Sequence, residues 1–590
     1  MSGSVKINIA NLVELGSFEV DERERAVIEN ELAEFLEYAR VLDGAPCGNV
    51  APASHAVEKK AYLREDLAYS VGDPGALLRG APLTTGTSYL VPPQKSGAGP
   101  GDEEKASSAE AAAGDYEAVI GLEVHAQLKT RSKLFCSCSA EFGHEPNENT
   151  CPVCSGHPGV LPVLNRQAVS MAIKAGVVMD CTINRRSVFE RKNYFYPDLP
   201  KAYQISQYEE PLCSGGHVEI DVDGARRRVR LNRIHMEEDA GKLVHVGAPG
   251  IWGAKASAVD FNRCSVPLIE IVSEPDMSTP QEAREYVTML RSILVSLGIC
   301  DGNMEEGSLR CDANISLRPR GTETLGTKTE IKNMNSFKAI EKAVGFEIER
   351  QKKLLARGIA VSQETRLWDE SSQKTYLMRS KEESHDYRYF PDPDLLPLEV
   401  DDEWVDSLKR SLPEMPLEIF DRSMNEYGFD RKEARLFMTN PAYARFFGEL
   451  VSRYGNARNA ANWFFNEVLS LLNGPIESMP LTPADMAEFL EKIDSGEISG
   501  KMGKSVLREA FESGNPISSI LADKGQRQIT DEAEIARMVG RVLDANPERV
   551  REYREGKTQV FGFLVGLVMK ESAGRANPAL VNTIMKNKLD

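Results

Sequence analysis

One stretch, Pro92 to Asp115, limits what this chain can fold into more than any other feature. It reads PPQKSGAGPGDEEKASSAEAAAGD, which is rich in Gly, Ser, Ala and charge and has no open-chain aliphatic side chain larger than Ala. Such a segment cannot bury enough apolar surface to form a core, so it is predicted to be a flexible linker. The chain is therefore expected to fold as separate modules on either side of it.

The whole chain is too long for a single core and has an ordinary globular composition. With 590 residues, 41% of them hydrophobic and 27% charged, it is expected to form about three to five folded units. Its net charge of −18 excludes a protein that coats nucleic acid indiscriminately, so any nucleic acid must meet a local basic patch. The best apolar run, Val560 to Met569, is too short to span a bilayer and predicts a buried helix. The N-terminus shows no secretory signal, so we expect a cytoplasmic protein without membrane contact.

The N-terminal module combines a helix with an extended arm. Residues 18–42 carry an apolar stripe at helical spacing, which predicts a helix with one apolar face. From about Gly44 to Leu90 this period is lost and Gly and Pro increase. We expect an arm that packs its scattered Leu and Tyr residues on another surface.

The block 116–405 alternates between strand-like and helical patterns. The runs EAVIGLEVHAQL and GHVEIDVDGARRRVRL alternate in polarity as antiparallel strands do, and the second contains a turn signal at Asp223 and Gly224. Helical patterns are predicted at 166–178, 280–297 and 338–357. The predicted fold class is therefore α+β, with an antiparallel sheet.

The sequence after about Ser411 is dominated by the helical period. Helix starts are marked by capping signals at Thr482-Pro483 and Asn546-Pro547. We expect a helical connector at 412–480 and a small helical tail at 481–590.

Two close pairs of cysteines predict a zinc site. The predicted ligands are Cys136, Cys138, Cys151 and Cys154. Soft thiolates at this spacing can close a tetrahedron around Zn2+, which explains the pattern better than four unpaired structural cysteines. A four-thiolate shell leaves no open position, so the ion is expected to hold a loop rather than to catalyse. The nearby His157 is a weaker ligand candidate because it lies in the turn sequence GHPG.

Glu123 and His125 alternate within the run GLEVH, so both are expected to project from one face of a strand. An exposed polar face is the ordinary explanation for such a pair. A second acidic block, residues 235–239 (HMEED), favours a different explanation. Carboxylates and an imidazole that folding brings together form a site for Mg2+ or Mn2+.

A third charged segment, Glu305 to Asn314, leads into the run EIKN at 330–333. Its acids can hold metal, and Arg310 and Lys332 can neutralise phosphate charge, although charged strands are usually solvated faces. The sequence contains no GxxxxGK[ST] loop and no GxGxxG after a strand, so ATP binding through those two devices is unsupported.

The run RSKEESHDYRYFPDPDL, from Arg379 to Leu395, mixes charge, aromatic residues and Pro. A surface loop closed by Asp-Pro turns is the plain interpretation. The alternative is that Tyr387, Arg388 and Tyr389 stack on unpaired nucleotide bases.

Several of these segments together resemble one enzyme family, the B subunit of the glutamyl/aspartyl-tRNA amidotransferase. They are GLEVHAQL, KNYFYPDLPKAYQISQ, HMEEDAGK, PLIEIVSEPD, MEEGSLRCDANISLRP and HDYRYFPDPDL, and the resemblance extends from about residue 116 to 590. Residues 1–93 resemble the small C subunit more weakly, through the opening helix, LREDLAYS and GAPLTTGTSYLVPP. The chain is thus identified as a C-like module fused to a B subunit, with 94–115 as linker and 116–411 as catalytic domain.

The resemblance implies an ATP-dependent carbon–nitrogen ligase that amidates misacylated Glu-tRNA(Gln) or Asp-tRNA(Asn). Its large cradle domain is similar in fold to glutamine synthetase and phosphorylates the side-chain carboxylate. A separate amidase, the A subunit, frees ammonia from glutamine or asparagine, and a tunnel delivers it. The implied partners are this amidase, tRNA(Gln) or tRNA(Asn), and a non-discriminating aminoacyl-tRNA synthetase.

The matching motifs also imply roles for individual residues. Glu123, His125 and Glu238 correspond to the catalytic residues and Mg2+ ligands. Candidates for ATP, phosphate or channel contacts are Glu237, Arg310, Asp312 and Lys332. Some members of the family carry structural Zn2+. In the tail, Lys557, Lys570 and Arg575 are the candidate tRNA contacts, for which a solvated helix face is the alternative.

Two other functions fit parts of the sequence. The chain would be a tRNA-binding adaptor if its acidic and cysteine clusters were only structural. A ligase for free amino acids is disfavoured, because activating a free amino acid needs no long helical region to grip tRNA. No Ser-Lys amidase signature is evident, so the chain alone is not expected to hydrolyse glutamine. The sequence does not decide between Glu-tRNA(Gln) and Asp-tRNA(Asn).

Overall fold

The computed structural model describes residues 61–68, 84–85, 88–91, 115–246, 256–380, 387–524, 529, 531–572 and 576–589. All of them belong to one compact unit, Lys59–Asp590. The helix predicted at 18–42 lies outside these ranges, as do nearly all of the predicted linker and most of the C-like module. None of the helices within the described ranges has both the length and the hydropathy needed to cross a lipid bilayer.

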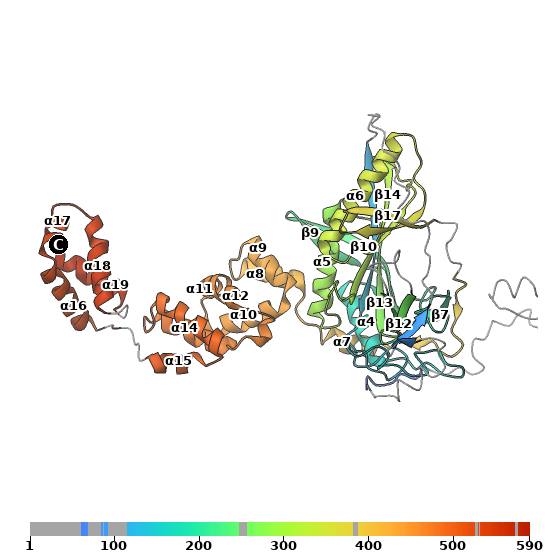
Figure 1. Cartoon of the computed structure of the whole chain (residues 1–590), viewed down its shortest axis with the longest axis horizontal. Helices are drawn as coiled ribbons and strands as arrows, with labels where there is room; N and C mark the ends of the chain where they lie inside the picture. The colour runs from blue at the N-terminus through green and yellow to red at the C-terminus, as the bar shows by residue number, and fades with distance from the viewer. Residues whose placement is uncertain are drawn as a thin grey trace, which may run out of the picture. The chain divides into compact units, whose positions relative to one another are not determined.

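A mixed sheet of ten strands is the largest sheet in the described part of the chain (Figure 1). Its spatial order is β17-β16-β15-β14-β3-β13-β10-β8-β4, and β9 pairs with β10 beside this path. The strands are β3 (Tyr116–Gln127), β4 (Thr182–Ile183), β8 (Cys213–Ser214), β9 (His217–Val222), β10 (Ala225–Glu238), β13 (Pro267–Ser273), β14 (Leu309–Pro319), β15 (Thr329–Lys332), β16 (Glu364–Asp369) and β17 (Lys374–Ser380).

The pairing of these strands is antiparallel with one exception. β15 and β16 run parallel, so the prediction of an antiparallel sheet is corrected to a mixed one. The chain between them forms α6 (Phe337–Ala356), because parallel neighbours need a long crossover connection. The predicted turn at Asp223 and Gly224 is confirmed, since both residues have positive φ angles, 51° and 93°, between β9 and β10.

Three helices cover one face of this sheet and bury its apolar side chains. They are α4 (Arg166–Val178), α5 (Pro280–Ser296) and α6, which match the predicted helices closely. α5 begins in a capping box, in which the Thr279 hydroxyl accepts a hydrogen bond from the Glu282 N–H and the Glu282 carboxylate accepts one from the Thr279 N–H. The helices pack against alternate residues of the strands, such as Ile120, Leu122 and Val124 of β3, which are fully buried. The opposite face of the sheet is therefore the one available for polar chemistry.

Smaller sheets attach to this domain. They are β1 (Thr84–Thr85), β2 (Ser88–Val91), β12 (Ala256–Asp260) and β11 (Lys242–Val246); β18 (Phe390–Pro391), β6 (Glu190–Asn193) and β7 (Tyr203–Ser206); and β19 (Leu398–Glu399) with β5 (Arg186–Ser187). β2 comes from the N-terminal arm and pairs with β12 of the catalytic domain. Arg64 of the same arm forms a parallel bridge with Asn165. The described parts of the arm thus attach to the catalytic domain, but the predicted packing of its described Leu and Tyr side chains holds only for Leu63, because Tyr62 and Leu67 are exposed.

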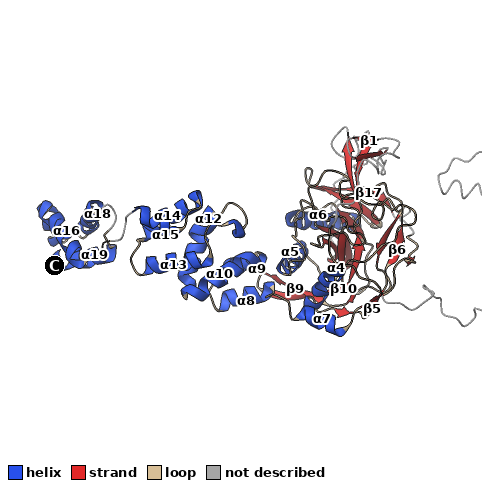
Figure 2. Ribbon diagram, turned by 90° about the horizontal axis from the view of Figure 1, so that it is seen from below, coloured by secondary structure: helices blue, strands red, loops and turns tan. Residues whose placement is uncertain are grey.

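The rest of the described chain is helical, as predicted (Figure 2). The helices are α7 (Asp402–Lys409), α8 (Pro416–Asn425), α9 (Arg431–Thr439), α10 (Pro441–Tyr454), α11 (Ala457–Trp463), the π-helix η3 (Phe464–Val468), α12 (Leu469–Leu471), the 3-10 helix η4 (Ile476–Ser478), α13 (Pro483–Asp494), α14 (Gly500–Ser513), α15 (Ile517–Lys524), α16 (Glu532–Ala545), α17 (Pro547–Arg554), α18 (Gln559–Glu571) and α19 (Pro578–Leu589). Thr482 and Asn546 are the N-cap residues of α13 and α17, which confirms both predicted helix starts. The buried residues of α16, α18 and α19 form a core of their own.

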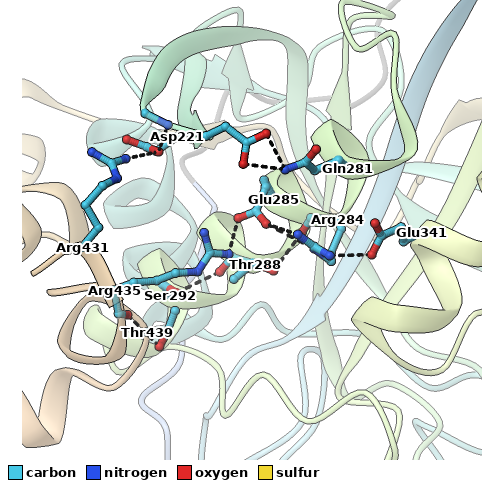
Figure 3. Close-up of polar contacts among 12 residues, drawn as sticks. Asp221, Gln281, Arg284, Glu285, Thr288, Ser292, Glu341, Arg431, Arg435 and Thr439 are labelled. Carbon is cyan, nitrogen blue, oxygen red and sulfur yellow. Dashed lines mark hydrogen bonds and ion pairs between the residues drawn. The ribbon is translucent and has the colours of Figure 1, made fainter. Parts of the chain in front are cut away.

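Ion pairs join α9 of the connector to the catalytic domain (Figure 3). Arg431 lies 2.5 Å from Asp221 of β9, and Arg435 contacts Glu285 of α5. Glu285 is buried and also accepts hydrogen bonds from Arg284, the closer of them at 2.8 Å. One buried carboxylate thus holds cations from two helices.

Candidate active site

The face of the sheet opposite the helices carries a row of charged side chains. The row crosses β15, β14, β3, β13 and β10, which are consecutive neighbours in the sheet. Paired residues of neighbouring strands project to the same side, so His125 lies between Arg310 and Glu270, and Glu270 lies beside His235. The full row is Glu330, Lys332, Asp312, Arg310, Glu123, His125, Glu270, His235 and Glu237.

His125, Glu237 and Glu270 form the centre of this row. Each offers one ligand atom, and the three atoms lie within 4.8 Å of one another. The His125 Nε2 atom is 3.6 Å from Glu237 Oε1 and 3.4 Å from Glu270 Oε2. In an octahedral Mg2+ site the metal–ligand distance is about 2.1 Å, so neighbouring ligand atoms are about 3 Å apart. The distances from His125 to the two carboxylates would need to shorten only slightly to bind such an ion. An imidazole with two carboxylates is also a donor set that Mg2+ and Mn2+ accept.

The charges in and around this cluster favour the binding of a cation. Burial alone would lower the pKa of His125, but the carboxylates of Glu270 and Glu237 raise it to about 9. Burial would raise the pKa of Glu270, but the imidazoles of His235 and His125 hold it well below its usual range. The Glu270 carboxylate therefore remains ionised and attracts a cation.

Glu123 lies on the same face, two residues before His125. Its Oε1 atom accepts a hydrogen bond of 2.9 Å from the Asn314 side chain. Burial raises the pKa of this carboxyl, and the nearby Glu270 raises it further. Glu123 borders the cluster, but its oxygens are not among the three converging ligand atoms.

Glu238 does not join the three converging ligand atoms, and the structure does not bring it together with Glu123 and His125 as the sequence predicted. Neighbouring residues of a strand project to opposite sides, and Glu237 is the one that reaches His125. The Glu238 carboxylate is buried, and its Oε1 atom accepts hydrogen bonds from Lys201 Nζ and from the Ile205 N–H, the latter at 2.9 Å. The sequence motif located the right block but could not choose between adjacent acids.

His235 and Arg233 hold Glu270 from its other side. Arg233 Nε donates to His235 Nδ1 at 3.3 Å, and His235 Nε2 lies 3.2 Å from Glu270 Oε2. The two ring nitrogens of His235 thus face different partners, with Nδ1 toward Arg233 and Nε2 toward the Glu270 carboxylate. This chain of contacts fixes the direction in which Glu270 points.

The other candidates, Arg310, Asp312 and Lys332, lie on the same face beside the cluster. Arg310 donates to Asp239 Oδ2 at 2.9 Å, and Gln127 donates to the same oxygen at 2.8 Å. Lys332 contacts Asp312 and lies 3.0 Å from Glu330. These carboxylates raise the pKa of Lys332 although burial alone would lower it, so the ammonium stays charged. The structure thus places these acids and cations on one face, and their individual roles stay predictions.

Aromatic residues and Lys192 form a wall beside the cluster. Lys192 Nζ lies 4.8 Å from the centre of the Tyr387 ring. Burial would lower the pKa of Lys192, but Glu237 and other anionic neighbours raise it. Tyr389 stacks on Tyr208 with ring centres 4.4 Å apart, and Arg233 lies over Tyr208 at 5.6 Å. Residues 387–389, which the sequence indicated only as a surface loop or a base-stacking segment, thus form part of the wall beside the cluster.

Sequence reasoning did not single out Glu270, His235, Arg233 or Lys192. Glu270 stands inside the apolar run PLIEIVS, and a carboxylate amid residues of a buried strand is itself a signal of function. His235 stood within a block already noted for its acids. Lys192 and Arg233 carry no comparable signal, because charged residues on strands are usually solvated.

The four cysteines also converge, as predicted. The sulfur atoms of Cys136, Cys138, Cys151 and Cys154 all lie within 4.8 Å of one another, and all four residues are buried. The sulfurs of Cys151 and Cys154 are 3.9 Å apart, close to the edge of about 3.8 Å expected for a tetrahedron with Zn–S bonds of about 2.3 Å. Lys133 is fully buried beside them, and its Nζ atom is 3.6 Å from the Cys154 sulfur. His157 is exposed and is not part of this cluster.

The candidate tRNA contacts of the tail lie on or after α18. Lys557 precedes this helix and is 65% exposed, with Glu552 at 3.7 Å. Lys570 is exposed in the last turn of α18. Arg575 lies outside the described residues. The two described lysines are therefore accessible, and their role in binding stays a prediction.

Comparison with known proteins identifies similar families over most of the chain. Residues 118–406 match the family model "GatB/GatE catalytic domain", and residues 445–589 match the model "GatB domain". The chain is 52% identical to the aspartyl/glutamyl-tRNA(Asn/Gln) amidotransferase B subunit from Carboxydothermus hydrogenoformans over 478 residues, which are 80% of this chain and 99% of that protein. It is 52% identical to the corresponding protein of Moorella thermoacetica over 479 residues, 80% of this chain and all of that protein. The corresponding protein of Geobacter sulfurreducens is 50% identical over 478 residues, with 80% and 99% covered.

Proposed function

The chain belongs to the family of aspartyl/glutamyl-tRNA(Asn/Gln) amidotransferase B subunits, and on this basis we propose that it amidates Glu or Asp esterified to tRNA in an ATP-dependent reaction. The reaction is that of a carbon–nitrogen ligase, with misacylated tRNA as substrate. Either Glu-tRNA(Gln) or Asp-tRNA(Asn), or both, is the substrate of this chain.

The cluster of His125, Glu237 and Glu270 is the observation that carries the proposal. A side-chain carboxylate is a poor acyl donor until its oxygen becomes part of a phosphate leaving group. Mg2+ bound at this cluster would neutralise the charge that develops on the phosphoryl group. The three side chains would hold the ion, and Glu123 borders it as a third carboxylate.

The cations around the cluster suit a substrate with several negative charges. Arg310 and Lys332 face the site on the same side of the sheet, and Lys192 approaches it from the wall. Arg310 and Lys332 already pair with carboxylates, which fixes their positions. The anionic neighbours of Lys192, led by Glu237, raise its pKa and keep it charged. We assign them to binding the phosphates of ATP and of the phosphorylated carboxylate. Asp312 orients Lys332, and ammonia then attacks the activated carbonyl and releases phosphate.

The four cysteines are proposed to bind Zn2+ with a structural role. Their burial and the closed arrangement of four sulfurs leave no position for a substrate. Lys133 would offset part of the negative charge that four thiolates place around one ion.

The arrangement of modules is a further part of this proposal. We propose a C-subunit-like module at 1–93, a linker at 94–115, a glutamine-synthetase-like cradle at 116–411, a connector at 412–480 and a tail at 481–590. Lys557, Lys570 and Arg575 of the tail would contact tRNA phosphates. A separate amidase A subunit would supply ammonia, and a non-discriminating synthetase would supply the misacylated tRNA.

Transfer of labelled oxygen tests this proposal. The purified chain is mixed with ATP, Mg2+ and Glu-tRNA(Gln) that carries 18O in its side-chain carboxylate, with ammonium ion replacing the amidase. Phosphorylation followed by amidation moves one 18O atom into inorganic phosphate and yields Gln-tRNA(Gln). A tRNA-binding adaptor would bind the same tRNA and release no labelled phosphate. Repeating the assay with Asp-tRNA(Asn) decides which substrate the chain uses.

A further inference from the structure

One described part of the N-terminal arm, residues 61–68, is attached through two charged side chains. Arg64 makes backbone contacts in register with the start of α4, since its N–H donates to Leu164 O and its carbonyl accepts from the Arg166 N–H, both at 3.0 Å. Its guanidinium donates to Val163 O at 3.0 Å and to Ser132 Oγ at 2.7 Å, and it also contacts Lys133 O. A single side chain thus contacts two segments far apart in sequence.

Asp66 bonds to the same two segments. Its carboxylate accepts hydrogen bonds from the Arg131 and Ser132 N–H groups, both at 2.7 Å, and from the Ser132 hydroxyl at 2.6 Å. It also accepts one of 3.0 Å from the side chain of Asn165. Burial alone would raise the pKa of Asp66, but these hydrogen bonds, led by the one from Ser132, lower it.

These two segments are the two ends of the loop that carries the four cysteines. The chain enters the loop at residues 131–134 and leaves it at 163–165, and the ends pair through Val163 N to Phe135 O at 3.0 Å and Asn165 N to Leu134 O at 2.9 Å. Arg64 and Asp66 each bond to both ends. The arm therefore closes the neck of the loop from outside.

Short connections lead from this neck to the sulfur atoms. Lys133 N donates to Cys138 O at 3.0 Å, and Ser132 bridges to Ser139. The Lys133 side chain extends inward to the Cys154 sulfur, while its carbonyl is one of the groups that Arg64 holds. A shift of the neck would therefore displace both cysteine pairs relative to each other.

We propose that the N-terminal arm is a positioning element of the metal site, so that docking of Arg64 and Asp66 and retention of Zn2+ at the four cysteines are energetically coupled. The inference rests on the proposed Zn2+ site and adds to it that the arm controls its stability. The coupling is reciprocal. If docking of the arm increases the affinity for Zn2+ by some factor, bound Zn2+ must strengthen the docking of the arm by the same factor. It gives the fused module a role in the catalytic domain besides any contact with other subunits.

The rate of Zn2+ release tests the first half of this coupling. The full-length chain is loaded with Zn2+, and release to an excess of the chromogenic chelator 4-(2-pyridylazo)resorcinol is followed in the wild type, Asp66→Ala, Asp66→Asn and Glu65→Ala. We expect release to be about 10-fold faster in Asp66→Ala, by analogy with groups that support metal ligands. Asp66→Asn keeps one acceptor oxygen and should lie between Asp66→Ala and the wild type. Glu65→Ala removes an equal charge from the exposed neighbouring position and should match the wild type.

Hydrogen exchange tests the second half. In the wild type, removal of Zn2+ should increase the exchange of the amides of residues 63–67, while exchange in β3 stays unchanged and reports an intact fold. Equal release rates in all variants, or arm exchange that does not respond to Zn2+, would overturn the inference. A wild-type chain that binds no Zn2+ would instead refute the metal site itself, and neither result depends on the amidation assay.

Discussion

The Nε2 atom of His125 and the Oε2 atom of Glu270 lie 3.4 Å apart, on residues that are direct partners in the pairing of β3 with β13. His235 contacts the same carboxylate oxygen at 3.2 Å. If His125 Nε2 binds a divalent ion, it no longer contacts Glu270 directly. His235 is then the side chain that orients the Glu270 carboxylate. The register of three strands therefore sets the geometry of the proposed metal site.

Replacing Glu270 by Gln should abolish most of the activity with little change in shape. The substitution keeps the side-chain volume but removes a negative charge from the cluster, so divalent-ion binding should weaken strongly. We expect the kcat of amidation to fall by about 100-fold or more at fixed Mg2+. Glu349→Gln, at an exposed position of α6, is the matched control and should retain wild-type activity. Full activity of Glu270→Gln would remove this residue from the proposed ligands.

His235 should act through Glu270 rather than on the substrate. Its removal leaves the carboxylate without the donor that fixes its direction, so His235→Ala should weaken Mn2+ binding by about 10-fold. His235→Gln places an N–H donor near the same position and should recover part of that affinity. The dissociation constant measured by electron paramagnetic resonance distinguishes the two variants. If His235→Ala and His235→Gln bind Mn2+ with equal affinity, a positioning role through the hydrogen bond to Glu270 is contradicted. This holds whether that affinity equals the wild-type value or is strongly reduced.

The contact between Arg435 and Glu285 should fix α9 on the catalytic domain. Hydrogen bonds to charged groups contribute about 1.5–3 kcal/mol, so Arg435→Met should increase amide exchange in α9 by about 10-fold. The affected amides are those of residues 431–439, and exchange in α14 should not change. Arg508→Met, at an exposed position of α14, is the control. Unchanged exchange in α9 would show that the contact between Arg435 and Glu285 does not hold this helix.

The exposed lysines of the tail should contribute to tRNA binding and not to ATP binding. Lys557→Gln and Lys570→Gln should each lower the dependence of log affinity on log salt concentration by about one unit if each lysine contacts one phosphate. The KM for ATP should stay at the wild-type value, because neither residue belongs to the sheet that carries the cluster. Lys352→Gln on α6 removes an exposed positive charge from the catalytic domain and serves as control. An unchanged salt dependence in both tail variants would favour a solvated helix face.

The fold of the described chain followed from local patterns to a large extent. Periodicity and capping are local signals in a sequence. They predicted the helices α4, α5 and α6 and the capped starts of α13 and α17. The parallel pairing of β15 with β16 was not, because strand order depends on contacts between distant segments. The cysteine cluster was predictable because its ligands are close in sequence and of one chemical type.

The active site was predicted only in part for the same reason. Alternation along one strand correctly placed Glu123 and His125 on one face. The choice between Glu237 and Glu238 depended on the register of β10 against β13, which no single strand encodes. Glu270 belongs to an apolar strand, where its carboxylate is held by imidazoles that come from two other strands.

Binding of Mn2+ to chain labelled with 15N-histidine tests the central claim most directly. Electron–nuclear double resonance should show a directly bound 15N nucleus in the wild type, and this coupling should disappear in His125→Gln. Glu237→Gln and Glu270→Gln should lower the affinity for the same ion. Two results would contradict a metal site at this cluster. In the first, Mn2+ binds but shows no coupling to a histidine nitrogen. In the second, all three variants keep both the wild-type coupling and the wild-type affinity for Mn2+.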